Sequence, residues 1–394
     1  MMNLGERLRS ARERRGISQQ AVAEALGLPR TAVTNMETGK RTVSTLELAR
    51  MAEIYGPPAA YFLAESEIDT QKDLLVILHR SLPEMAEKPE IDQAVGHIVD
   101  LCREGASLKI MLNQTTGQTA PEYSNRMTSV GNAIRQGQHV AQEERKRLGL
   151  GHAPIGSIAE IITDQGIWTA ATDLTDSLSG FFINHPSIGA AILVNTRHWP
   201  VRRRFSYAHE YAHALFDRHA PVTTTRQENA AELIEKHANA FAAAFLMPAE
   251  GVAEQLSQLD KGHPSRAEIR PRPGSQAITY QDVAALAHHF GVSYEAAVWR
   301  LKSLRHINQP KTKTLIPQKE VGRRYIKLLG FLDIFDEGEH EPPLEVGLRN
   351  QLTRLALKAY RQGEISRGRI AEISRKLTIN PVEMIELAEA AGGD

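Results

Sequence analysis

Two histidines four residues apart, with a glutamate directly after the first, form the pattern in this chain best suited to metal chemistry. They lie in the sequence His209-Glu210-Tyr211-Ala212-His213, within a helix-favouring run over residues 205–217. Residues four apart share one face of a helix, so both imidazoles can bind one ion. Catalytic zinc sites use three protein ligands and leave a fourth position to water, for which Glu210 is a candidate general base. The pattern predicts a site for Zn²⁺, with Mn²⁺ as a second possibility. The alternative is that the pattern occurs by chance, because the chain has 15 histidines.

A third ligand is expected from a second helix downstream. Residues 227–247 are rich in Ala, lack Gly and Pro, and end before Pro248, so we predict one helix there. Three carboxylates fall at i, i+4 and i+7 on one face of it: Glu228, Glu232 and Glu235. The spacing does not choose among them, and a solvated acidic stripe is the alternative.

These segments resemble the ImmA/IrrE family of metallopeptidases. The resemblance covers approximately residues 129–304 and rests on three runs, namely 192–195, 203–213 and 235–248. In that family the third ligand is the glutamate four residues before the Asn of an E-x-x-A-N motif, which here is Glu235. The resemblance therefore implies a gluzincin-like zinc endopeptidase with His209, His213 and Glu235 as ligands and Glu210 as the catalytic base. Tyr211-Ala212 stands where many members carry a small or aliphatic pair.

The N-terminus carries a separate pattern of short helices. An Arg-rich amphipathic helix over residues 4–15 stops at Gly16, Ser18 caps a second helix through Leu26, and Pro29 opens a third that ends at Thr38-Gly39. Two short helices joined by a tight turn are typical of a helix-turn-helix. Residues 3–64 resemble the Cro/C1 (XRE) DNA-binding family, through Ile17-Ser18-Gln19-Gln20, Ala23, Gly27, Val33 and Met36-Glu37-x-Gly39-Lys40-Arg41.

The charge of this segment suits a nucleic acid. Residues 1–64 carry nine Lys and Arg against six Glu, whereas the whole chain has a formal net charge of zero. We expect base contacts from the exposed face of the third helix and phosphate contacts from its surroundings. The predicted DNA-binding residues are Arg30, Thr31, Thr34 and Asn35 on that helix, with Gln19, Gln20, Lys40 and Arg41 around it.

Length and composition indicate a multidomain protein of the cytoplasm. A chain of 394 residues exceeds one ordinary core, and its single cysteine, Cys102, excludes an internal disulfide framework. We find no apolar run long enough for a membrane and no signal-peptide core at the start. The expected parts are a helix-turn-helix domain, a helical acidic connector, a metallopeptidase domain and a helical C-terminal domain, over residues 1–64, 65–128, 129–308 and 309–394.

The fold class follows from these parts. An all-α head precedes an α+β zincin-like core, in which short strands over residues 167–171, 180–183 and 190–195 form a small sheet before the HExxH helix. Such a sheet could align an extended substrate along its edge strand. We predict a linker over residues 311–317, and then further helices. Residues 263–327 hold twelve basic and four acidic side chains, which could add a second DNA-contacting surface or form a solvated face.

Two functions of different class are compatible with the sequence. The first is a DNA-binding transcriptional regulator whose zinc endopeptidase cleaves a protein partner, such as a co-encoded repressor, antitoxin or toxin. The second is a non-catalytic XRE-type regulator or antitoxin whose metal domain senses a ligand or docks a partner. Glu210 favours the first, since a pure sensor has no use for a general base. In both cases we expect a homodimer on an inverted-repeat operator in double-stranded DNA, and no membrane partner.

Overall fold

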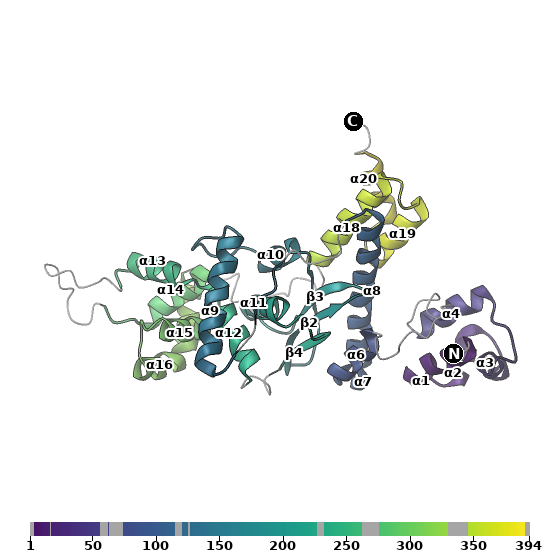
Figure 1. Ribbon diagram of the computed structural model, residues 1–394, viewed down its shortest axis with the longest axis horizontal. Coiled ribbons are helices and arrows are strands. Elements are labelled where there is room, and N and C mark those ends of the chain that lie inside the picture. The colour runs from purple at the N-terminus through teal and green to yellow at the C-terminus, as the bar shows by residue number, and fades with distance from the viewer. Residues whose placement is uncertain are drawn as a thin grey trace. The chain divides into compact units, whose positions relative to one another are not determined.

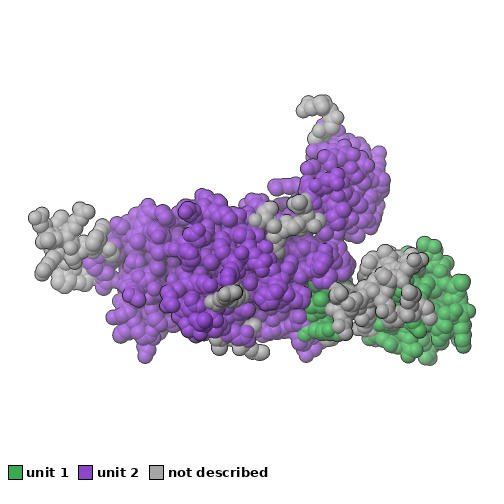
Figure 2. Space-filling model, viewed as in Figure 1, with its two compact units in different colours: residues 1–80 green, residues 81–394 purple. Residues whose placement is uncertain are grey.

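A computed structural model describes most of the chain in two compact units. It describes residues 4–15, 17–55, 62, 74–114, 120–124, 127–226, 232–261, 276–329 and 346–390. The units are Met1–Arg80 and Ser81–Asp394 (Figures 1 and 2). Within these ranges no helix is both long enough and apolar enough to cross a bilayer.

The first unit is helical, and its start matches the predicted helix-turn-helix. Its helices include α1 (Leu4–Arg14), α2 (Gln19–Leu26), α3 (Arg30–Glu37) and α4 (Thr45–Tyr55). Ser18 caps α2 by accepting a hydrogen bond from the Ala21 amide, and Gly27 ends it with a φ of 68°. That left-handed conformation favours glycine, so the turn between α2 and α3 is encoded locally. Leu8, Val22 and Met51 pack inside.

A buried ion pair joins α1 to α3. Arg12 donates to Glu37 through Nε at 2.5 Å and through Nη2 at 3.0 Å. Gln19 at the start of α2 also donates to Glu37, at 2.8 Å. Leaving one member of such a pair alone inside a protein is costly, so these contacts fix the three helices relative to one another.

The second unit contains a four-stranded mixed sheet with the strand order β1-β3-β2-β4. Its strands are β1 (Trp168–Thr172), β2 (Leu178–His185), β3 (Gly189–Asn195) and β4 (Val222–Arg226). β1 is parallel to β3, and β2 is antiparallel to both β3 and β4. The first three strands were predicted, whereas β4 was not, because its sequence, Val-Thr-Thr-Thr-Arg, lacks apolar alternation.

Three long helices pack around the sheet and one another (Figure 1). α11 (Pro200–Phe216) lies against β2 and β3, and α12 (Leu233–Leu246) packs against both α11 and α9 (Val130–Arg147). Phe182 and Ile192 of the sheet and Phe241 of α12 belong to the core between them. The predicted α+β arrangement, with the HExxH helix next to a small sheet, is confirmed.

Further helices cover this core or extend from it. α18 (Val346–Arg361) packs against α8 (Pro89–Met111) and β1. α8 also holds α19 (Arg367–Lys376) through Glu104, which accepts from Arg369 at 2.6 and 2.8 Å and from Lys376 at 3.3 Å. The other helices of this unit are α7 (Glu84–Glu87), α10 (Ile158–Asp164), α13 (Ala249–Gln258), α14 (Tyr280–Phe290), α15 (Tyr294–Ser303), α16 (Gln309–Leu315), η1 (Ile316–Gln318), α17 (Lys319–Leu328) and α20 (Pro381–Ala390). Helix α6 (Leu74–Ser81) lies at the end of the first unit.

Two secondary-structure predictions were wrong. The helix predicted over residues 227–247 begins only at Leu233, because β4 pairs with β2 up to Arg226 and Glu232 has an extended backbone at the N-cap position. The linker predicted over residues 311–317 is mostly helix α16. Asn308 caps that helix by accepting from the Lys311 amide, and a proline in the first turn is compatible with a helix start.

The contact between α9 and α12 depends on a glycine. A Cβ added at Gly137 would lie 2.4 Å from the His237 carbonyl oxygen, so we predict that Gly137→Ala pushes the helices apart and destabilises the protein by about 1–3 kcal/mol. The control is Gly131→Ala in the same helix, where the nearest atom is the end of the Arg135 side chain at 3.5 Å. Thermal unfolding should show a lower midpoint for the first variant and an unchanged or higher one for the second; equal midpoints would contradict this close packing.

Candidate functional site

Helix α11 carries both predicted histidine ligands into the interior. Pro200 occupies its first turn, where the missing amide hydrogen breaks no helical hydrogen bond. Ala208 and Ala212 are fully buried on the same helix, and their small side chains let neighbouring elements approach its backbone. His209 and His213 are 2% and 0% exposed, and their Nε2 atoms lie 3.1 Å apart.

Glu235 on α12 completes a group of three potential ligands. Its carboxylate oxygens lie 3.2 Å from His209 Nε2 and 3.6 Å from His213 Nε2, and the side chain is almost fully buried. One ligand atom from each residue lies within 4.8 Å of the others, so one cation could contact all three. Glu232 is exposed at the N-cap position of α12, and Glu228 lies outside the described residues. Two imidazoles and a carboxylate form the donor set that catalytic zinc accepts.

Neighbouring side chains orient both imidazoles. Asp217 lies 2.8 Å from His213 Nδ1, and the Asn239 side-chain oxygen lies 3.2 Å from His209 Nδ1. These contacts direct each Nε2 toward Glu235, as in metal sites where the second ring nitrogen donates a hydrogen bond. Burial opposes protonation of His213, but the Asp217 hydrogen bond and the nearby carboxylates outweigh it, so its pKa is raised.

Glu210 lies beside this group with both carboxylate oxygens buried. Neither oxygen has a hydrogen-bond partner among the described residues. Burial raises the pKa of the Glu210 carboxyl, against the opposing electrostatic effects of His213 and His209. Gly180 on β2 leaves room for this side chain, because a Cβ there would lie 3.2 Å from Glu210 Oε1. A buried carboxylate with unused acceptors is suited to exchanging a proton with a reactant.

Strand β4 brings two hydroxyls to the same face of the sheet as Glu210. Thr225 is paired with Gly180 and Thr223 with Phe182, so both threonine side chains point to the side on which Glu210 meets Gly180. The two hydroxyl oxygens are buried and have no partner among the described residues. β4 is an edge strand of the sheet, where an extended peptide could pair by main-chain hydrogen bonds.

Sequence reasoning did not identify several of these contributors. Asp217 lies four residues after His213, a spacing from which its contact could have been inferred, and Asn239 lies in the motif that the family resemblance used. Thr223 and Thr225 could not have been found in this way, because their strand was not predicted. Their role depends on the pairing of β4 with β2.

The predicted DNA-binding residues divide into free and engaged side chains. Arg30, Thr31 and Asn35 are exposed on α3, and Lys40 is exposed beside it. Gln20 is also exposed, but its side chain donates to Glu24 at 2.8 Å. Thr34 donates to Gln19 at 3.1 Å, and Gln19 in turn donates to Glu37, so this pair belongs partly to the interior. Arg41 is paired with Glu47 at 2.7 Å.

Fold and geometry thus define two modules, a helix-turn-helix unit and an α+β unit with an HExxH…E group. Residues 3–60 match a family model described as a helix-turn-helix domain. Residues 162–302 match the model of a peptidase family, described as the IrrE N-terminal-like domain. The chain therefore combines an XRE-type helix-turn-helix domain with an ImmA/IrrE-family domain, as the two resemblances implied.

The chain is also similar to two curated regulators. It is 24% identical over 115 residues to the HTH-type transcriptional regulator PuuR of Escherichia coli (strain K12), a match that covers 29% of this chain and 53% of PuuR. It is 28% identical over 87 residues to the HTH-type transcriptional regulator ImmR of Bacillus subtilis (strain 168), which covers 22% of this chain and 68% of ImmR. The match thus spans about half the length of PuuR.

The ligand group makes a testable prediction about metal content. We expect the purified protein to hold about one Zn²⁺ or Mn²⁺ per chain, and we expect Glu235→Ala to lose it because two imidazoles cannot complete the site. The exposed Glu232→Ala is the matched control and should keep the metal. Elemental analysis decides: full occupancy in Glu235→Ala together with loss in Glu232→Ala would move the ligand assignment to Glu232.

Proposed function

We propose that this protein is a DNA-binding transcriptional regulator with a zinc-dependent endopeptidase domain. The observation that carries the proposal is the buried group of His209, His213 and Glu235 with the unpaired Glu210 carboxylate beside it. A structural metal site would need the ligands but not this carboxylate. The similarity to HTH-type regulators and to a peptidase family supports joining the two activities in one chain.

In the proposed reaction, the chain's own residues position a peptide and move protons. A zinc ion held by His209, His213 and Glu235 would polarise the scissile carbonyl and activate water. Glu210 accepts the proton of the attacking water and delivers it to the leaving amine. Thr225 lies on the same face of the sheet as Glu210, and the edge of β4 holds the substrate extended.

The proposed substrate is a protein partner of the same regulatory system, such as a co-encoded repressor, antitoxin or toxin. If that partner is bound to DNA, the helix-turn-helix of this chain would bring the peptidase domain to it. The main-chain recognition offered by β4 requires an extended segment, so the cleaved bond should lie in a linker or loop of that partner.

A second candidate is a non-catalytic regulator whose metal domain senses a ligand or docks a partner. The observation that favours it is that the relatives above are named as transcriptional regulators. Both candidates require the metal ligands, but only the peptidase requires the Glu210 carboxylate.

Replacement of Glu210 separates the two candidates. We predict that Glu210→Gln keeps the metal but abolishes cleavage of the neighbouring gene's product, because an amide cannot accept the water's proton. Metal content by elemental analysis and cleavage by gel electrophoresis, each with and without chelator, are the measurements. The exposed Glu232→Gln is the control and should cleave normally. Unchanged regulation in cells that carry Glu210→Gln would favour the non-catalytic candidate.

For the helix-turn-helix unit we propose binding as a homodimer to an inverted repeat in double-stranded DNA, in the cytoplasm. One recognition helix makes few base contacts, and paired half-sites about one helical turn apart supply the rest. The exposed α3 residues Arg30, Thr31 and Asn35 are proposed to read bases, with Gln20, Lys40 and Arg41 on phosphates. Thr34 and Gln19 are proposed to support that surface, since they are bonded to each other.

The base and phosphate roles can be told apart by substitution. We predict that Arg30→Ala relaxes preference at one base position, at a cost of about tenfold to a hundredfold in discrimination, if Arg30 reads a guanine. Lys40→Ala should weaken binding to all sequences alike and flatten its salt dependence. Electrophoretic mobility shifts on operator variants at several salt concentrations measure both. Arg9→Ala, exposed on α1, is the control; a uniform loss in Arg30→Ala would reassign Arg30 to phosphate.

A further inference from the structure

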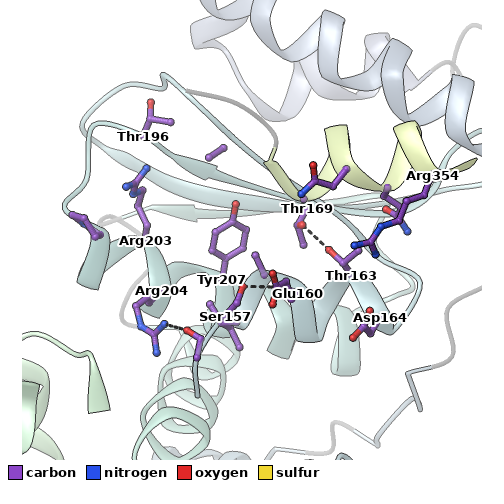
Figure 3. A pocket seen from close by; sticks show the side chains of 18 residues that line it. Ser157, Glu160, Thr163, Asp164, Thr169, Thr196, Arg203, Arg204, Tyr207 and Arg354 are labelled. Carbon is purple, nitrogen blue, oxygen red and sulfur yellow. Dashed lines mark hydrogen bonds between the residues drawn. The ribbon is translucent and has the colours of Figure 1, made fainter. Parts of the chain in front are cut away.

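A cavity lies in the second unit, on a different side of α11 from the group of His209, His213 and Glu235. It has a volume of about 910 Å³ and is walled by α10, β1, α11 and α18 (Figure 3). Tyr207 lines it, and at about 100° per residue Tyr207 is about 200° around the helix from His209. The cavity is therefore separate from the group of His209, His213 and Glu235, none of which lines it, although the same helix contributes to both. Its volume is in the range of small-molecule sites.

Two arginines on different walls of this cavity have guanidinium groups that are open to a ligand. Arg203 on α11 is half-buried and Arg354 on α18 is exposed, and neither guanidinium forms a hydrogen bond or ion pair with a described residue. They come from different walls, and Figure 3 shows them at opposite sides of the cavity. Guanidinium groups bind planar or tetrahedral oxyanions through several N–H donors. This pair points to a ligand with anionic oxygens.

A third arginine is part of the wall. Arg204 donates to the carbonyl oxygens of Gly156 at 2.5 Å, Ile155 at 2.6 Å and Gly291 at 3.0 Å. These bonds hold the segment before α10 against α11, so the cavity is shaped before any ligand binds. Arg204 is therefore a structural residue of the cavity, in contrast to Arg203.

The other polar side chains that line the cavity include hydrogen-bond acceptors, which would bind hydroxyl groups of a ligand. Gln351 on α18 has a buried side-chain carbonyl oxygen without a partner, and it lies one turn from Arg354. Glu160 and Asp164 line the cavity from α10, and their carboxylates form no ion pair with any described residue. Both carboxylates are exposed to water, so the buried Gln351 oxygen is the acceptor among these three that lacks a donor, and a hydroxyl group of a ligand would supply one.

We propose that this cavity binds a small phosphorylated, hydroxyl-rich molecule of the sugar phosphate or nucleotide class. Arg203 and Arg354 take the phosphate oxygens, and Gln351 with the α10 carboxylates takes the hydroxyls. Because α18 and α11 form opposing parts of the wall, a bound ligand ties the C-terminal helices to the helix that carries the HExxH residues. The ligand would thus act as a regulatory input to that site, a consequence that rests on the proposed peptidase function.

Direct binding to the full chain tests the site without a peptidase substrate. We expect ribose 5-phosphate and AMP to bind in isothermal titration, and neutral ribose to bind much more weakly. Arg203→Gln and Arg354→Gln should each lower the affinity by about tenfold or more, because each removes a charged hydrogen bond. Arg202→Gln and Lys358→Gln are matched controls on the same two helices, outside the lining. Unchanged unfolding midpoints of the unliganded variants show that they fold.

The outcomes separate this site from the peptidase. Glu210→Gln should bind the same probes with unchanged affinity, because Glu210 does not line the cavity. If the original chain binds the probes but cleaves no partner, the cavity proposal stands and only its link to proteolysis fails. Three results would overturn it: neither phosphorylated probe binds at millimolar concentration, ribose binds as tightly as ribose 5-phosphate, or both arginine variants bind like the original chain.

Discussion

The structure depends on placing three ionisable side chains where almost no water reaches them. His209, His213 and Glu235 are nearly fully buried, and burying such groups is costly unless each has partners. They have them in one another and in the side chains behind the histidines, Asp217 and Asn239. The core around them, with α11 against the sheet and α12 held close to α9 through Gly137, is what keeps this group together.

Helix α11 contributes side chains to three different surroundings. Along α11, His209 and His213 face Glu235 of α12, and Glu210 faces Gly180 and the threonines of β4. Tyr207 and Arg203 line the cavity next to α10 and α18. A shift of this helix along its axis would change all of these surroundings together. Under the ligand-binding proposal, this shared helix is the physical basis on which binding beside α18 would act on His209, His213 and Glu235, because packed elements move as units.

Local signals in the sequence predicted a large part of the fold. The second helix begins after Ser18, whose hydroxyl caps it, and ends at Gly27, which adopts the left-handed conformation that favours glycine. The apolar run before Asn195 forms the buried strand that it indicated. The secondary-structure predictions were wrong where strand pairing or helix capping, and not amino-acid composition, determined the structure. The polar β4 is a strand because β2 supplies its hydrogen bonds, and the polar segment after Asn308 is a helix because that asparagine caps it.

The HExxH spacing by itself determined the histidine pair and the adjacent glutamate, because positions four apart on a helix share a face in any fold. It left the third ligand open among Glu228, Glu232 and Glu235, since all three fit one helical stripe. The family resemblance implied Glu235, and the tertiary structure supplies the physical reason, because the helix starts at Leu233 and packs across α11 so that Glu235 meets the histidines. The threonines beside Glu210 and the cavity at Arg203 and Arg354 were likewise decided only by chain segments distant in sequence coming together, which local periodicity cannot encode.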